Sequence, residues 1–182
     1  MLVFVPPAQR IRDVETRDFT TTVNLAAELG FADSQVFFYT DAEIAQTVQR
    51  WTANNVKTIR IGIPWAGVEA LKGKYDWSRA DRVVSAAAAA NIAIICAITS
   101  SPMWATAPGA MYPHGRPASP ADYGVFTAKV AERYKGKIAA YEIWNEPNGM
   151  KGYSPAPDAN GYTDLLKAAY PRIKAVDPTA VI

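Results

Sequence analysis

Apolar residues along the chain follow two spacings in turn, one typical of strands and one typical of helices. In residues 56–63, Ile59, Ile61 and Ile63 share one face of a predicted strand, whereas Arg60 lies on the other face. Residues 92–99 form a nearly continuous apolar run, as expected of a strand that is covered on both faces. Further strands are predicted over residues 138–144 and, only just begun, over residues 180–182.

Helices are predicted between these strands. Thr40 and Glu43 have the spacing of a capping box, which predicts a helix that begins there and ends near Asn54. Ser119 and Pro120 are the residue types preferred at an N-cap and at a first helical position. The second helix has a small-residue face suited to packing on the sheet, formed by Val83, Val84, Ala87 and Ala88. The apolar stripes of the other helices are Ile44, Val48 and Trp51 in the first, Tyr123, Phe126, Val130 and Tyr134 in the third, and Tyr162, Leu166, Ala169, Ile173 and Val176 in the fourth.

The strand-then-helix alternation begins near Glu28 and repeats in units of about 30 to 45 residues, which is typical of a parallel α/β architecture. A chain of 182 residues has room for one such domain of ordinary size. We therefore expect residues 1–27 to be an N-terminal arm and residues 28–182 to be the folded unit.

Composition narrows the classes of function. Hydrophobic residues at 49% and charged residues at 20% match an ordinary globular protein. The formal net charge of +2 is too small for a nucleic-acid-binding footprint, so no nucleic acid partner is expected. Cys96 and His114 are the only residues of their types, which leaves no disulfide framework and no multi-cysteine or two-histidine metal motif. Cys96 is predicted to be a buried strand residue. His114 is predicted to be a plain loop residue, with a catalytic histidine as the alternative.

No segment of the sequence predicts a membrane span. The longest apolar stretch, residues 86–98, is interrupted by Asn91 and is shorter than the roughly 20 residues that a span requires. The N-terminus lacks the basic region of a signal peptide. A cytoplasmic location is expected on that basis, or a secreted one if the N-terminus is incomplete.

Candidate chemistry follows the fourth predicted strand, which ends in Trp144-Asn145-Glu146-Pro147. Parallel α/β folds build their sites at the carboxyl ends of strands. A carboxyl group at such a position can act as a general acid when limited solvation or a second carboxylate raises its pKa, and cleavage of an acetal needs such an acid. A solvated loop glutamate before a proline is the other interpretation of Glu146, and position alone leaves both open.

A family resemblance separates these two interpretations. Trp144-Asn145-Glu146-Pro147 after an apolar strand resembles the fourth-strand signature of the clan A glycoside hydrolases, and families 5 and 39, which include cellulases and β-xylosidases, are the most similar. The segment from Thr58 to Trp65 resembles the second strand, Lys72 to Trp77 resembles the turn before the next helix, and Ser101 to Trp104 resembles the end of the third strand.

This resemblance implies a (β/α)8 TIM barrel that hydrolyses O-glycosidic bonds in β-linked poly- or oligosaccharides by a retaining mechanism, with no cofactor and no metal. It implies that Glu146 is the acid/base group and that Asn145 is a hydrogen-bond donor to the sugar 2-hydroxyl. It also implies that Arg60 orients the nucleophilic carboxylate. The alternative for Arg60 is an ion pair with Glu142. Side chains alternate between the two faces along a strand, and this alternation places Glu142 on the inward face as well.

Trp65 and Trp104 are candidate sugar-stacking residues, because they follow the second and third strands; the alternative for each is simple packing. Of the two, Trp104 is the preferred candidate.

The chain departs from the family in length. A barrel takes about 250 residues, and only about four βα units plus the start of strand five are present, so we expect a partial barrel. The nucleophile expected on strand seven is not among these units. A fragment, a split gene product, a half-barrel that assembles with another chain, and a noncatalytic remnant are all compatible with this.

Two classes of function follow: a glycosidase, acting directly or after completion, and a noncatalytic carbohydrate-binding or assembly half-barrel. The expected partners are a carbohydrate and, through the open barrel edges, a second copy or a complementing chain.

Overall fold

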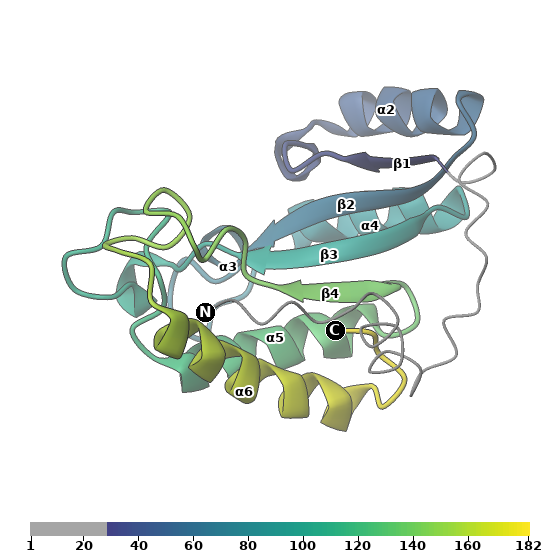
Figure 1. Ribbon diagram of the computed structural model, residues 1–182. Coiled ribbons are helices and arrows are strands. Elements are labelled where there is room, and N and C mark those ends of the chain that lie inside the picture. The colour runs from purple at the N-terminus through teal and green to yellow at the C-terminus, as the bar shows by residue number, and fades with distance from the viewer. Residues whose placement is uncertain (1–28) are drawn as a thin grey trace, which may run out of the picture.

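The computed structural model describes residues 29–182 and contains one parallel sheet (Figure 1). Its four strands lie in the order of the chain, each hydrogen-bonded to the next: β1 (Leu29–Ala32), β2 (Val56–Pro64), β3 (Ala93–Thr99) and β4 (Ala140–Ile143). The predicted parallel α/β architecture is confirmed. The predicted arm over residues 1–27 lies outside the described residues.

Helices connect successive strands, and Figure 1 shows α5 and α6 side by side next to β4. The long helices are α2 (Asp41–Ala53), α4 (Ser78–Ala89), α5 (Pro120–Tyr134) and α6 (Ala159–Val176). Short helical turns are η1 (Val36–Phe38), α3 (Trp65–Val68) and η2 (Met103–Ala105). None of the helices within residues 29–182 combines the length and apolarity needed to cross a membrane.

Local sequence signals set the helix starts. The Thr40 hydroxyl accepts a hydrogen bond from the Glu43 backbone N–H at 3.3 Å, and the Glu43 carboxylate accepts one from the Thr40 N–H at 2.8 Å. This is the predicted capping box, which satisfies two backbone donors that the first turn of α2 leaves free. In α5 the Ser119 hydroxyl caps the Asp122 N–H at 3.2 Å, with Pro120 at the first helical position.

The core lies between one face of the sheet and the helices. Ile59, Ile61 and Ile63 are at most 2% exposed, as their predicted common face requires, and Cys96 is fully buried. Arg60 is only partly buried on the opposite face, which is the inner face of a barrel.

Two predicted core positions are wrong. Ala88 of α4 is exposed, and Leu166 of α6 is 36% exposed, whereas its neighbour Leu165 is buried. In α6 the buried residues Leu165, Ala169 and Ile173 recur every four positions and fix which face meets α5. Because successive helical residues turn by about 100°, Leu166 points away from that face.

The end of the chain runs beside β4, as predicted for the start of a fifth strand. Val181 forms a parallel bridge with Ala140, and the Tyr141 N–H donates to the Val181 carbonyl at 2.9 Å. The strand predicted over residues 138–144 is shorter than expected, because regular pairing with β3 covers only Ala140–Ile143.

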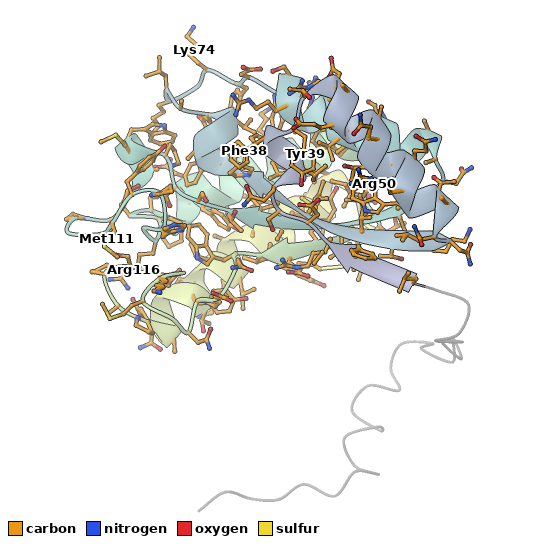
Figure 2. The ribbon with its side chains drawn as sticks, turned by 90° about the horizontal axis from the view of Figure 1, so that it is seen from above. Phe38, Tyr39, Arg50, Lys74, Met111 and Arg116 are labelled. Carbon is orange, nitrogen blue, oxygen red and sulfur yellow. The ribbon has the colours of Figure 1, made fainter. Side chains whose placement is uncertain are left out.

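Two loops beyond the carboxyl ends of the strands hold each other. The loop after β3, which carries Met111 and Arg116 in Figure 2, pairs with the loop after β4 through a bridge between Gly115 and Ser154. The Met111 N–H donates to the Ser154 hydroxyl at 2.8 Å, and Arg116 forms an ion pair with Asp158. These contacts fix the walls around the strand ends.

Candidate active site

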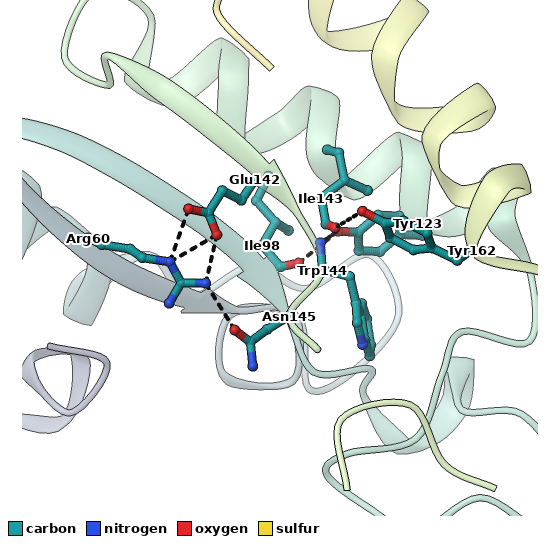
Figure 3. A network of polar contacts seen from close by, with 8 residues as sticks. All are labelled: Arg60, Ile98, Tyr123, Glu142, Ile143, Trp144, Asn145 and Tyr162. Atoms are coloured by element: carbon teal, nitrogen blue, oxygen red, sulfur yellow. Dashed lines mark hydrogen bonds and ion pairs between the residues drawn. The ribbon is translucent and has the colours of Figure 1, made fainter. Parts of the chain in front are cut away.

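An ion pair joins β2 and β4 across the inner face of the sheet. The Arg60 Nε donates to both Glu142 carboxylate oxygens at 3.0 and 2.9 Å, and Nη2 donates to Oε2 at 2.6 Å (Figure 3). The side chains are 29% and 39% exposed, so water still reaches the pair. Hydrogen bonding to Glu142 raises the pKa of the Arg60 guanidinium, which keeps this cation charged.

The register of the strands explains how the pair forms across β3. Arg60 is level with Ile95 on β3, and Glu142 is level with Ala97, two residues nearer the carboxyl ends. Gly62 and Ala97 between them carry little or no side chain and line a cavity of about 340 Å³ together with Arg60. The guanidinium therefore has room to extend toward β4.

Arg60 also fixes the amide of Asn145. Its Nη2 donates to Asn145 Oδ1 at 2.9 Å. Because a guanidinium has only donors, this bond requires the amide oxygen to face Arg60 and leaves the Asn145 Nδ2 group free to donate elsewhere. Asn145 lines the 340 Å³ cavity, so a donor is available to a bound molecule there.

Glu146 lies just past the end of β4 with its side chain exposed. It lines a second cavity of about 770 Å³ with Arg60, Glu142 and Asn145, so the structure brings these predicted site residues together. Among residues 29–182, no side chain or backbone group hydrogen-bonds its carboxylate, which is thus accessible for proton transfer to a ligand.

The backbone around Glu146 adopts an uncommon conformation. Trp144 and Glu146 have φ angles of +68° and +47°, in the left-handed region that non-glycine residues rarely adopt. Such conformations cost about 1–3 kcal/mol each and persist where the surrounding structure holds them. They are frequent at functional sites, and here they occur in the segment that carries the candidate acid.

Hydrogen bonds join the strand ends beside this segment to α5 and α6. The buried Tyr123 hydroxyl donates to the Ile98 carbonyl at 2.7 Å and accepts from the Trp144 N–H at 3.1 Å. The Tyr162 hydroxyl of α6 donates to the Ile143 carbonyl at 3.1 Å (Figure 3). Sequence reasoning assigned Tyr123 and Tyr162 only to packing stripes, because nothing in their spacing indicates a hydroxyl partner.

The two candidate sugar-stacking tryptophans lie outside both cavities. Trp65 has no exposed surface: its ring stacks on Phe126 at 5.5 Å and its Nε1 donates to Glu69 at 2.6 Å. Its burial fits the packing alternative, and a role in sugar stacking stays a prediction. Trp104 is partly buried, with its Nε1 bonded to the Glu69 carbonyl at 3.0 Å and the Lys72 ammonium 4.9 Å from its ring. Its role in sugar stacking stays a prediction.

Three further residues near the site were not among the site residues predicted from sequence. Gln35, His114 and Gly152 line the 340 Å³ cavity beside Asn145. His114 is a loop residue, as predicted, but the Ser154 N–H bonds its carbonyl at 3.1 Å and holds it at the cavity. In the part of the chain that the structure describes, no group of three or more His, Cys, Asp or Glu side chains is arranged to hold a metal ion.

Together, the parallel βα units and the polar cluster at the ends of their strands define part of a (β/α)8 barrel of the glycoside hydrolase type. The family model that matches the chain is Cellulase (glycosyl hydrolase family 5), over residues 16–182. Because this match covers most of its length, the chain belongs to that family, and the resemblance seen in the sequence is confirmed.

Individual proteins agree with this assignment. The β-galactosidase BbgII of Bifidobacterium bifidum is 31% identical, over 67% of this chain and 21% of its own length. A family 39 glycoside hydrolase from Bacteroides cellulosilyticus WH2 superimposes with a TM-score of 0.67 at 24% identity, covering 85% of this chain and 30% of that one. A monomeric β-xylosidase from Caulobacter crescentus CB15 gives a TM-score of 0.62 at 22% identity, covering 84% and 34%. The chain thus spans about a fifth to a third of the length of these relatives.

Proposed function

We propose that this chain supplies the acid/base half of a retaining glycoside hydrolase that acts on β-linked poly- or oligosaccharides. The observation that carries the proposal is Glu146, exposed at the carboxyl end of β4 beside an Asn145 amide whose orientation Arg60 fixes. Membership of a glycosyl hydrolase family supports a carbohydrate as the substrate.

Glu146 is the proposed proton donor to the leaving oxygen and, in the second step, the base that activates water. Its carboxylate faces a cavity with no competing partner among residues 29–182, so a substrate oxygen can approach it. Of the other side-chain carboxylates among residues 29–182, Glu142 lines the same cavity, and three hydrogen bonds bind it to Arg60.

Asn145 is the proposed donor to the sugar 2-hydroxyl. With its oxygen turned to Arg60, the free Nδ2 group offers N–H bonds toward the cavity. Hydrogen bonds to that hydroxyl strengthen in the oxocarbenium-like transition state, so an amide that is already oriented lowers the barrier without a reorganisation cost.

The nucleophile is proposed to come from a later barrel strand. A retaining mechanism needs two carboxyl groups about 5 Å apart on either side of the anomeric carbon. Glu142 is a poor candidate, because it lies four residues before Glu146, deeper along β4, and is neutralised by Arg60. Arg60 Nη1, which makes no hydrogen bond within residues 29–182, is free to hold the incoming carboxylate.

Azide rescue tests this function in the complete enzyme. Glu146→Ala should form the glycosyl-enzyme from an activated aryl β-glycoside but hydrolyse it slowly, since no base activates water. Azide, which needs no base, should restore turnover and give a β-glycosyl azide. Loss of activity that azide does not restore, or an α-azide product, would refute the assignment.

A second candidate function is a noncatalytic carbohydrate-binding or assembly half-barrel. It is favoured by the 770 Å³ cavity open between β4 and α6, where Leu166 and Tyr170 are exposed, and by the exposed Leu29 and Phe31 on the edge strand β1. Unpaired parallel edges with apolar residues recruit another chain or a second copy.

The neighbouring coding sequence discriminates the two candidates. A downstream segment that encodes strands five to eight, with a glutamate at the end of strand seven, is expected for the glycosidase. A partner chain or homo-oligomer that binds sugar without turnover is expected for the half-barrel.

A further inference from the structure

The backbone of Glu146 is held from the far side of its own loop. Gly152, six residues later, returns to the strand end and lines the 340 Å³ cavity beside Asn145. A Cβ atom at position 152 would lie 2.4 Å from the Glu146 carbonyl oxygen and 2.8 Å from the Glu146 Cβ. It would also lie 3.0 Å from the Asn145 carbonyl oxygen. Contacts this short with backbone atoms cannot be relieved by rotating a side chain.

Gly152 is itself anchored to the sheet through Trp144. The indole Nε1 donates to the Gly152 carbonyl at 2.7 Å. The Trp144 backbone N–H donates to the Ile98 carbonyl of β3 at 3.1 Å, and its ring lies edge-on to Tyr123 and Tyr153, each 5.7 Å away between ring centres. A continuous set of contacts thus runs from the core of the sheet to Gly152 and on to Glu146.

These contacts explain how Glu146 keeps a φ of +47°. With no hydrogen-bond partner for its carboxylate among residues 29–182, the side chain is not held by its own interactions. Its position depends on the backbone, and the backbone is confined by Trp144 on one side and by Gly152 on the other.

We propose that Gly152 is a positioning residue for the acid/base step: the absence of a side chain at 152 sets where the Glu146 carboxylate stands relative to the leaving oxygen. The catalytic part rests on the proposed function of Glu146. Gly152 acts through Glu146 and needs no contact with the substrate. Displacement of a catalytic group by about 1 Å can cost about 100-fold in rate, which sets the scale of the effect.

The first test measures the Glu146 backbone directly in the 182-residue chain. Gly152→Ala is compared with Gly149→Ala, a matched control in the same loop whose added Cβ would meet only the Glu146 carbonyl oxygen, at an ordinary 3.8 Å. The readouts are the ¹³Cα chemical shift and the HN–Hα coupling of Glu146, which report φ. Gly152→Ala should move both, and Gly149→Ala should leave both as in the native chain. Unchanged values in a folded Gly152→Ala variant would overturn the proposal.

The second test uses the complete enzyme and aryl β-glycosides with good and poor leaving groups. Gly152→Ala should lower kcat about 100-fold on the poor leaving group and only a few-fold on the activated one, with KM little changed. A loss of stability alone would reduce both rates equally. If Glu146→Ala itself shows no dependence on the leaving group, the proposed function fails; if Glu146→Ala shows it and Gly152→Ala does not, the positioning role is refuted.

Trp144→Phe keeps the proposal testable if Gly152→Ala does not fold. It removes the donor to the Gly152 carbonyl and retains an aromatic ring between Tyr123 and Tyr153. The ¹³Cα shift and HN–Hα coupling of Glu146, and the dependence of kcat on the leaving group, should change in the same direction as expected for Gly152→Ala, by a smaller factor. Signals and rates identical to the native protein would contradict the proposal.

Discussion

The hydroxyl of Tyr123 is expected to stabilise the end of the sheet on which the candidate acid depends. Tyr123 is fully buried in α5 and bridges two strands, donating to the Ile98 carbonyl at 2.7 Å and accepting from the Trp144 N–H at 3.1 Å. Burial raises the pKa of this hydroxyl well above its ordinary value, so it remains a donor over the whole working pH range. Tyr123→Phe removes both hydrogen bonds and leaves the aromatic ring unchanged.

The size of the effect follows from what remains after the substitution. The Trp144 N–H still donates to the Ile98 carbonyl at 3.1 Å, so neither backbone group is left without a partner. Two neutral buried hydrogen bonds are lost, at about 0.5–1.5 kcal/mol each, without the full penalty of an orphaned group. We expect a loss of about 1–2 kcal/mol in the free energy of unfolding. For a chain of this length that lowers Tm by about 2–8 °C.

Urea unfolding and amide hydrogen exchange measure this, with Tyr134→Phe as the matched control. The Tyr134 hydroxyl, also on α5, donates to the Asp81 carboxylate of α4 at 2.9 Å, and its loss should cost about 1.5–3 kcal/mol, the range for a hydrogen bond to a charged group. Protection of the Trp144 amide should fall in Tyr123→Phe and stay unchanged in Tyr134→Phe. A cost below about 0.3 kcal/mol for Tyr123→Phe, or equal Trp144 protection in both variants, would refute the reasoning.

Three further predictions concern charge and assembly. Glu142→Ala should cost about 1 kcal/mol in urea unfolding, because the pair with Arg60 is about one-third exposed and therefore screened; a cost above about 3 kcal/mol would mean a fully desolvated pair. Hydrogen bonding from Arg133 lowers the pKa of Asp81, so its contribution to stability is present above the pKa of an unfolded Asp, about 3.9, and is lost as pH falls through the lower folded value. In Arg133→Gln the free energy of unfolding should therefore fall less steeply at acidic pH than in the native chain. An identical pH dependence in the two proteins would contradict this. The 182-residue chain alone should self-associate in sedimentation and should not turn over aryl β-glycosides; a monodisperse monomer whose turnover Glu146→Gln abolishes would overturn this.

The fold was predictable wherever a short-range signal determined it. The capping box at Thr40 and Glu43 marked the start of α2, and the alternation of Ile59 and Ile61 with Arg60 identified the inner face of β2. Helix phase was less certain, because several adjacent alanines or leucines offer more than one apolar stripe, and packing against α5 selects Leu165.

The site was predictable in part. The alternation of side chains along β2 and β4 placed Arg60 and Glu142 on one face of the sheet, and in the structure the two form an ion pair. The hydrogen bond from Arg60 to Asn145 could not be predicted, because it depends on the small residues Gly62 of β2 and Ala97 of β3 and on the turn after β4. For Trp65 the sequence left both sugar stacking and packing open: the segment after β2 becomes the short helix α3, which places the ring in the core against Phe126.

The contact between Gly152 and Glu146 has no sequence signal beyond a glycine in a loop rich in glycine and proline. It arises from the path of that loop back across the strand end, which only three-dimensional packing determines.

The measurement that tests the central claim most directly is the leaving-group dependence of Glu146→Ala in the complete enzyme. If Glu146 protonates the leaving oxygen, the variant should lose about 100-fold or more in kcat/KM on an aryl β-glycoside with a poor leaving group and far less on an activated one. An equal loss on both substrates would show that Glu146 is not the acid.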